Sequence, residues 1–286
     1  MPTWFLCPTS PMRLILIAFL LLSALVTANP ADALEERVVL PGGAELFLMR
    51  PDKPGPWPIM LFLHGHQSPP RPGARVFLKL DQRPRLATVD EGRLAHMQDR
   101  GYLAAAVSLP GYGATPGPAD FWGPRSQAVL QEALDYLLAQ PNVDQDHVGV
   151  YGVSGGAATA SMQATRDGRI RALILAAGVY DLGEAYPSGD PGLDDYIRRE
   201  AGTTPESFAS RAALRYADKI RAHTLILHGE KDDRGGTVHQ ARRLADRLRN
   251  HGTPVRIRIY EGTPHSIPMN LQWQEIDPFL KQFFGR

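Results

Sequence analysis

Cysteine is almost absent from this sequence of 286 residues, in which Cys7 is the single one. One cysteine cannot form an internal disulfide, so burial of apolar side chains must hold the fold together. Cys7 lies within or before an apolar leader. If that leader is removed, the chain carries no thiol, which excludes a thiolate zinc site and a cysteine nucleophile.

An excess of charge of either sign is also missing, because 31 Lys and Arg stand against 30 Asp and Glu. Without a basic field we expect no nucleic-acid partner and no attraction to an anionic membrane. We interpret the basic stretch with Arg242, Arg243, Arg247 and Arg249 as the solvated face of a helix. The sequence lacks a glycine-rich phosphate loop and a dinucleotide fingerprint.

Long apolar runs are missing except at the N-terminus, where residues 14–28 follow Arg13. This run suits the core of a signal peptide and is short for a membrane span. We therefore predict a signal peptide over residues 1–28, with cleavage possibly as late as residue 33. The start is open between Met1 and Met12.

The predicted leader places the rest of the chain, residues 34–286, in the periplasm or outside the cell as a single domain. No stable membrane span is then expected after cleavage. In the alternative interpretation the leader stays uncleaved and anchors the protein in the membrane. The sequence says nothing of the oligomeric state.

Short apolar runs alternate with helix-like segments over residues 34–286, which predicts an α/β fold with a mostly parallel sheet covered by helices on both faces. An antiparallel hairpin is expected at residues 37–49, with its turn at 41–43. Buried strands are expected at 59–63, 102–107, 148–151, 170–177, 224–227 and 255–260, and helices near 87–100, 126–139, 238–248 and 271–284.

One stretch interrupts this alternation, at residues 183–220, where the sequence is polar and rich in glycine and proline. It contains a helix-like piece at 193–201. We interpret the stretch as a cap-like insertion over the strand ends. A plain surface excursion is the alternative.

Ser154 stands in the motif Gly-Val-Ser-Gly-Gly at residues 152–156, between a predicted strand and a run of small residues suited to a helix start. That is the setting of a nucleophile elbow, in which a tight turn demands glycine on both sides of the serine. A hydroxyl at a helix N-terminus has backbone N–H groups nearby that can hold an oxyanion. Ser154 is therefore the candidate nucleophile.

A serine needs a base and a group that orients the base. In this type of fold the order along the chain is serine, acid, histidine. Asp232 and Asp233 follow the strand expected at 224–227, and His265 follows the strand expected at 255–260. We predict Asp232 as the acid, with Asp233 as the alternative, and His265 as the base.

The second oxyanion donor is expected in the loop after the first buried strand, where His64-Gly65-His66-Gln67 stands. We predict the backbone N–H groups of His66 and Gly155, with Gln67 as an alternative. A metal site at His64 and His66 is disfavoured, because no carboxylate accompanies the two histidines. Aromatic residues either line a substrate pocket or pack, which the sequence leaves open: Tyr112, Phe121, Trp122, Tyr180, Tyr186 and Tyr196.

These motifs resemble the α/β-hydrolases, in particular dienelactone-hydrolase-like esterases and the catalytic domain of the prolyl oligopeptidase family. The matching pieces are His64-Gly65, residues 110–113, 152–156 and 225–234, and His265, and the approach at 210–220 resembles the prolyl oligopeptidase group. The resemblance implies an acyl-enzyme mechanism without cofactor, carried by Ser154, Asp232 and His265. His66-Gln67 departs from that group, in which Gly and Pro usually follow His-Gly.

We expect hydrolysis of a carboxylic ester, because the resemblance comes without room for the large N-terminal propeller that gates prolyl oligopeptidases. The alternative is an exported serine peptidase, and the expected substrate is thus a small-molecule ester or a short peptide. A further alternative is a non-catalytic binding protein with the hydrolase fold.

Overall fold

The structure is a computed structural model that describes residues 1, 35–78 and 92–285. The chain divides into two compact units, Met1–Ala33 and Leu34–Arg286, and the fold described below is that of the second. The predicted signal peptide lies outside the described residues, as do Cys7 and the first part of the helix expected at 87–100. Among the residues described, no helix is both long and apolar enough to cross a membrane.

One sheet of eight strands forms the centre of this unit, in the order β1-β2-β4-β3-β5-β6-β7-β8. The β1–β2 hairpin joins β4 by antiparallel pairing, and all later neighbours pair in parallel, as the sequence predicts. The strands are β1 (Glu36–Val39), β2 (Glu45–Met49), β3 (Trp57–Leu63), β4 (Leu103–Val107), β5 (Val143–Val153), β6 (Ala172–Ala176), β7 (His223–Gly229) and β8 (Val255–Tyr260).

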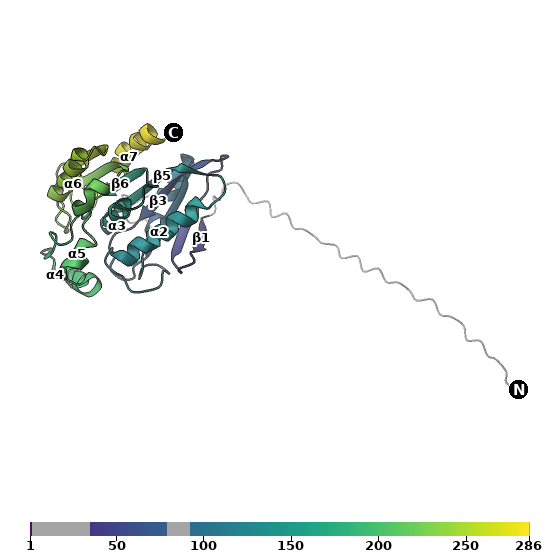
Figure 1. Ribbon diagram of the computed structural model, residues 1–286, viewed down its shortest axis with the longest axis horizontal. Helices are drawn as coiled ribbons and strands as arrows, with labels where there is room; N and C mark the ends of the chain where they lie inside the picture. The colour runs from purple at the N-terminus through teal and green to yellow at the C-terminus, as the bar shows by residue number, and fades with distance from the viewer. Residues whose placement is uncertain (2–34, 79–91, 286) are drawn as a thin grey trace, which may run out of the picture. The chain divides into compact units, whose positions relative to one another are not determined.

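Helices cover both faces of the sheet (Figure 1). Apolar residues of α2 (Pro124–Leu138), α3 (Gly155–Ala164) and α6 (Val238–Asn250) pack in one core with one set of strand side chains. Those of α1 (Arg93–Asp99) and α7 (Met269–Phe284) form a second core with the other set. Alternate strand residues point to opposite faces, so strands apolar at every position serve both cores.

Residues 183–220, for which we predict a cap-like insertion, form short helical pieces: α4 (Pro191–Tyr196), a π-turn η2 (Ile197–Ala201), α5 (Pro205–Ala209) and a 3-10 segment η3 (Ala213–Lys219). Asp190 starts α4, because its side chain accepts hydrogen bonds from the backbone N–H groups of Gly192 and Leu193. The helix-like piece expected at 193–201 consists of the end of α4 and the π-turn that follows it. Outside this stretch, a further 3-10 segment, η1 (Gly73–Phe77), lies earlier in the chain, between β3 and α1.

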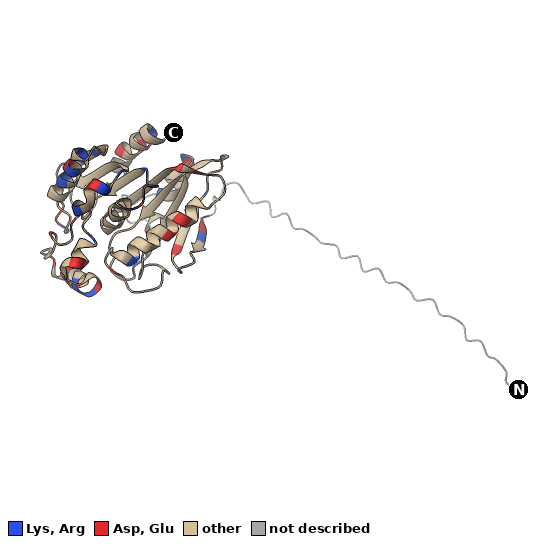
Figure 2. Cartoon of the chain, viewed as in Figure 1, with Lys and Arg blue, Asp and Glu red and all other residues tan. Residues whose placement is uncertain are grey.

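The basic residues of α6 lie along its surface (Figure 2), in agreement with a solvated helix face. Arg242, Arg247 and Arg249 are exposed, and Arg243 is half-buried. Arg243 donates to the Glu184 carboxylate at 2.6 Å, and Arg249 pairs with Asp246 at 2.8 Å. These two pairs place Arg243 and Arg249 beside carboxylates at the surface of α6.

Candidate active site

Ser154 lies on a sharp turn between β5 and α3. Its φ of 54° falls in the left-handed region, which is strained for a residue with a side chain. A Cβ on Gly152 would lie 2.4 Å from the Gly156 carbonyl oxygen, and one on Gly156 would lie 2.2 Å from that of Leu63. Both glycines are therefore required for the strand and the helix to approach this closely, as the elbow motif predicts.

His265 and Asp232 form a direct pair. Nδ1 of His265 lies 2.9 Å from each carboxylate oxygen of Asp232, whose side chain is fully buried. An ionised carboxylate only accepts hydrogen bonds, so Nδ1 carries the proton and Nε2 presents a lone pair. Asp233, the alternative acid, is exposed. Of the two aspartates, the structure brings Asp232 to His265.

The loops after β7 and β8 are held together by backbone contacts. Lys231 donates its backbone N–H to the Thr263 carbonyl at 2.9 Å, and Glu230 donates to that of Tyr260 at 3.0 Å. A Cβ on Gly229 would lie 2.3 Å from the Pro264 carbonyl oxygen, so only glycine fits this crossing. The Asp232–His265 pair is thus set by main-chain geometry.

His228 is a second histidine on the Asp232 carboxylate, and the sequence analysis missed it. Its Nε2 lies 3.3 Å from Oδ2 of Asp232 and 3.1 Å from the Gly236 carbonyl oxygen. Burial lowers the pKa of His228, and its ring N–H donates to the Gly236 carbonyl while the ring lies against the Asp232 carboxylate. The four-residue spacing between His228, near the end of β7, and Asp232, in the loop that follows, is the pattern that could have revealed it.

Hydrogen bonds join the strand ends that carry Ser154 and Asp232. Ser154 donates its backbone N–H to the Ala176 carbonyl, and Ala177 donates to that of Leu227, both at 2.8 Å. Val153 and His265 line the same hollow of about 270 Å³. Ser154, Asp232 and His265 thus gather at the C-terminal edge of the sheet, where open α/β sheets bind ligands. Among the described residues, no hydrogen bond joins Ser154 Oγ to His265; such bonds often lengthen without substrate.

The loop after β3 brings its backbone against the nucleophile. A Cβ on Gly65 would lie 2.7 Å from Cβ of Ser154, so this loop touches the serine. Buried His64 donates from Nδ1 to the Gly65 carbonyl at 2.8 Å and accepts the Leu109 N–H at Nε2, at 3.0 Å. His64 thereby fixes the peptide plane that carries the His66 N–H. Within the described chain, no hydrogen bond occupies that N–H.

Of the two oxyanion donors, Gly155 is the first residue of α3, and its N–H has no partner inside the helix. The backbone N–H of the alternative, Gln67, interacts with the Tyr112 hydroxyl, and its side chain donates to and accepts from the backbone of Gly73. The structure therefore leaves the N–H groups of His66 and Gly155 open beside Ser154. Burial lowers the pKa of the His66 side chain to about 4, so this imidazole is neutral.

The aromatic residues divide between packing and the site. Tyr180 is buried in the core, and Tyr186 packs against Phe208. Tyr112 and Tyr196 contact His66, the first through a 3.2 Å hydrogen bond and the second ring to ring. Phe121 and Trp122 line a small cavity of about 10 Å³ together with residues of the segment after β6, of the insertion and of the loop that follows Asp232: Val179, Leu182, Leu193, Ile197 and Arg234.

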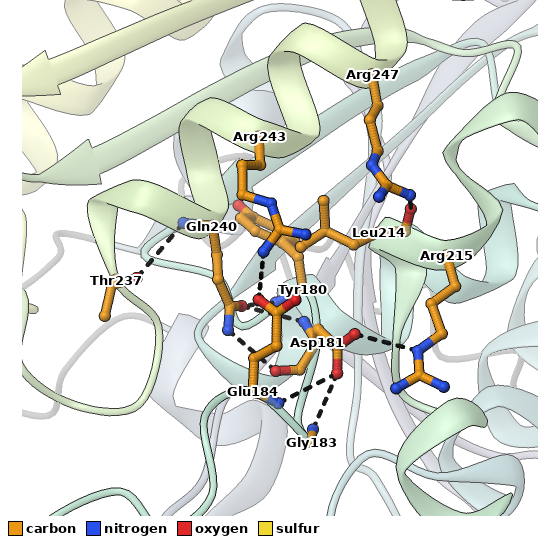
Figure 3. A network of polar contacts seen from close by, with 10 residues as sticks. All are labelled: Tyr180, Asp181, Gly183, Glu184, Leu214, Arg215, Thr237, Gln240, Arg243 and Arg247. Carbon is orange, nitrogen blue, oxygen red and sulfur yellow. Dashed lines mark hydrogen bonds and ion pairs between the residues drawn. The ribbon is translucent and has the colours of Figure 1, made fainter. Parts of the chain in front are cut away.

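Gln240 on α6 forms hydrogen bonds with the segment after β6, which contributes to the lining of this cavity (Figure 3). Gln240 accepts the backbone N–H groups of Tyr180 and Asp181 and donates to the Asp181 carbonyl. Asp181 accepts in turn from the backbone N–H groups of Gly183 and Glu184 and from Arg215. Nothing in the sequence pattern singles out this buried glutamine.

A wider hollow of about 530 Å³ lies on the other side of that segment, between the insertion and α6. Arg215 and Arg243 line it and pair with Asp181 and Glu184 across it (Figure 3). Ser154, Asp232 and His265 are not among its lining residues. Its larger size therefore does not make it the reaction site.

A metal site gains no support in the part of the chain that the structure describes. No group of three or more His, Cys, Asp or Glu side chains is placed to hold an ion there. Both ring nitrogens of His64 are engaged with the backbone. His64 therefore fixes the loop that carries His66.

Known proteins of one family match this chain in sequence. The family model of the prolyl oligopeptidase family, Peptidase_S9, matches residues 93–286. The uncharacterized peptidase YtmA of Bacillus subtilis is 26% identical over 185 residues, which is 63% of this chain and 71% of that protein. Dipeptidyl-peptidase 5 of Porphyromonas gingivalis is 27% identical over 207 residues, covering 66% of this chain and 29% of the relative.

Solved structures share the fold at lower identity. Acylaminoacyl peptidase of Pyrococcus horikoshii superposes with a TM-score of 0.69 at 18% identity, over 88% of this chain and 41% of that one. A puromycin-hydrolyzing peptidase of Mycobacterium tuberculosis gives 0.71 at 19% identity, over 88% and 39%. The chain thus spans about two fifths of the length of these structures. The chain has the α/β-hydrolase fold, and it belongs to the prolyl oligopeptidase family.

Proposed function

We propose that this protein is an exported serine peptidase that cleaves short peptides through an acyl-enzyme on Ser154. The observation that carries the proposal is the strained elbow at Ser154, which shares one sheet edge with the buried Asp232–His265 pair. The family match and the peptidase relatives favour amide cleavage over the ester hydrolysis expected from the sequence. The notion of a non-catalytic binding protein has no observation in its favour.

In the proposed reaction, Ser154 Oγ attacks the scissile carbonyl carbon while His265 Nε2 takes the hydroxyl proton. Asp232 holds the proton on Nδ1 of His265 and stabilises the imidazolium that forms. The N–H groups of Gly155 and His66 donate to the oxyanion of the tetrahedral intermediate. His265 then protonates the leaving amine, the C–N bond breaks, and the acyl-enzyme remains.

Water completes the cycle by the same steps in reverse. His265 removes a proton from the water as the water oxygen attacks the acyl carbon, and the proton returns to Ser154 Oγ as the C–O bond to the enzyme breaks. The products are a carboxylic acid, an amine and the free enzyme. Esters pass through the same intermediate, so activity on activated esters accompanies peptidase activity.

A pair of matched substrates tests the proposal. An acetylated dipeptide p-nitroanilide and the p-nitrophenyl ester of the same acyl group share the carbonyl and differ in the leaving group. We expect turnover of both, with Ser154→Ala at least 10³-fold slower on each. Ester turnover without any anilide turnover would contradict the peptidase proposal and return the protein to the esterases.

A further inference from the structure

Trp122 lies directly beside the nucleophile. Its position bears on which substrates the protein accepts, provided that the proposed function holds. We propose that Trp122 determines specificity: its indole ring limits the acyl pocket to a side chain of about the size of alanine. Its indole N–H binds an oxygen of the substrate. The protein then cleaves after small residues such as glycine, alanine or serine.

The first observation is the contact between Trp122 and Gly155. An ideal Cβ on Gly155 would lie 1.7 Å from both Nε1 and Cε2 of the indole ring. The ring thus fills the volume that a side chain on the residue after the nucleophile would occupy. Since the Gly155 N–H is an oxyanion donor, this volume borders the acyl group of a bound substrate.

The second observation is that the chain holds Trp122 in a costly conformation. Phe121 and Trp122 have φ of 47° and 66°, in the left-handed region, which costs about 1–2 kcal/mol for each residue. Arg211, at the end of the insertion, donates from Nε to the Phe121 carbonyl at 2.8 Å and from Nη2 to that of Asp120 at 2.5 Å. Arg211 is itself buried, so the turn is clamped from the insertion.

The third observation is the space that remains. The cavity bounded by Trp122 holds about 10 Å³, which is about the room that one water molecule needs. Trp122, which covers Gly155, forms one part of its lining, and Arg234 and Gly235, which follow Asp232 in the sequence, form another. A methyl group fits this space with little adjustment, whereas a leucine or phenylalanine side chain requires the indole to leave.

The fourth observation concerns the indole nitrogen. Nε1 of Trp122 is buried, and within the described residues it has no hydrogen-bond partner. A buried donor without a partner is costly and is usually satisfied by a ligand or a water. Trp57, at the opposite end of β3 from His64, donates its Nε1 to the Lys53 carbonyl at 2.6 Å. The unsatisfied donor is therefore a feature of Trp122 at this site.

The test uses p-nitrophenyl esters of acetyl-glycyl amino acids that differ in the residue at the reacting carbonyl, either alanine or phenylalanine. Activated esters report acyl preference whether the natural substrate is an amide or an ester. For the wild-type protein we expect kcat/KM for the alanine ester to exceed that for the phenylalanine ester at least 100-fold. A wild-type preference for phenylalanine would overturn the inference.

Two substitutions separate the ring from its N–H. Trp122→Ala should raise kcat/KM for the phenylalanine ester at least tenfold relative to the alanine ester. Trp122→Leu, which leaves a smaller cavity, should change the preference in the same direction. Trp122→Phe should lower kcat/KM about tenfold on both esters and leave the preference unchanged. Trp57→Phe, the matched control, should change neither quantity.

Labelling of Ser154 by a fluorophosphonate is measured on the same preparations, to keep this inference apart from the proposed function. Labelled variants whose acyl preference equals that of the wild type would overturn the role of Trp122 and leave the serine hydrolase intact. An unlabelled, folded wild-type protein would overturn both. A Trp122→Phe variant with wild-type kcat/KM would overturn the role of the indole N–H.

Discussion

His64 and His66 lie beside the nucleophile as neutral imidazoles, because burial lowers the pKa of each to about 4. Near pH 5 the folded protein therefore does not readily protonate either imidazole. In the unfolded chain, both side chains return to a pKa near 6.5. Acid therefore acts on the loop that carries the oxyanion donor.

This leads to a pH prediction for stability. Between pH 7 and pH 5 the unfolded state takes up a proton at His64 that the folded state refuses, so the free energy of unfolding falls as pH falls. We expect His64 to contribute about 2 kcal/mol of that decrease. Urea unfolding of wild type and His64→Gln at the two pH values measures it.

The control for this prediction is His239→Gln, because His239 is an exposed residue of α6. Its stability should follow pH as the wild type does. If His64→Gln lost stability with the same slope as the wild type, the assignment of a depressed pKa to His64 would be wrong.

At the scale of elements, the sharpest constraint is the elbow between β5 and α3. Gly156→Ala would place a methyl carbon 2.2 Å from the Leu63 carbonyl oxygen, so β3 or α3 must move. We expect a loss of about 2–4 kcal/mol in the free energy of unfolding and a loss of activity. Thermal denaturation and turnover of an activated ester measure the two effects.

Gly168→Ala is the matched control, since a Cβ at Gly168 has nothing within 4 Å. Its stability should stay within about 0.5 kcal/mol of the wild type. Equal behaviour of the two alanine variants would mean that the close approach of strand and helix is not what the motif glycine provides.

The insertion is fastened to the loop after β3 by Arg71. Its guanidinium pairs with the Glu200 carboxylate and lies 5.0 Å from the Tyr112 ring centre and 5.4 Å from that of Tyr196. Glu200→Gln should cost about 1–3 kcal/mol at this half-buried pair and increase proteolytic cleavage within residues 183–220. Limited proteolysis followed by mass spectrometry locates the cuts.

Asp195→Asn serves as the control within the same insertion, because Asp195 pairs with Arg198 and Arg199 at the surface. Surface ion pairs contribute little, so its cleavage pattern should match that of the wild type. If Glu200→Gln and the wild type were cleaved equally within residues 183–220, the Arg71–Glu200 pair would not be what holds the insertion in place.

Most elements of the fold could be predicted, because strands buried on both faces are apolar at every position and α6 shows a clear apolar stripe. β8 agreed residue for residue at 255–260. The long β5 was underestimated, since its first half, with Asp144, Gln145 and Asp146, is polar and lies outside the core. The π-turn after α4 was missed because it follows from backbone geometry and leaves no mark on apolar periodicity.

Some residues of the candidate site could likewise be predicted from the sequence, and others could not. Ser154, Asp232 and His265 could be located because each follows a strand in a fixed order. The supporting residues could not be found so directly: His228, Arg211 and Gln240 act through contacts with segments distant in sequence or through loop geometry. Trp122 was seen as an aromatic residue, but its contact with Gly155 exists only in three dimensions.

At the scale of the whole molecule, export is a proposal that the cysteine content makes easy to test. Cleavage after residue 28 or 33 would remove Cys7 and leave a chain without any thiol. We therefore expect denatured protein purified from the exported fraction to give no thiol titre and an intact mass that begins at residue 29 or 34. One thiol per chain would mean that the leader is retained as an anchor.

The single reactive serine is the central claim for the molecule as a whole. A strained elbow, a buried carboxylate–histidine pair and two open N–H groups have a common purpose only if Ser154 attacks a carbonyl. A fluorophosphonate reacts with such a serine and leaves ordinary hydroxyls untouched.

The most direct measurement is peptide mapping of the folded wild-type protein after fluorophosphonate labelling, with Ser154→Ala and His265→Ala alongside. We expect one adduct per chain, located on Ser154, no adduct in Ser154→Ala, and labelling slowed at least 10³-fold in His265→Ala. A folded wild-type protein that stays unlabelled, or an adduct on any other residue, would contradict the account.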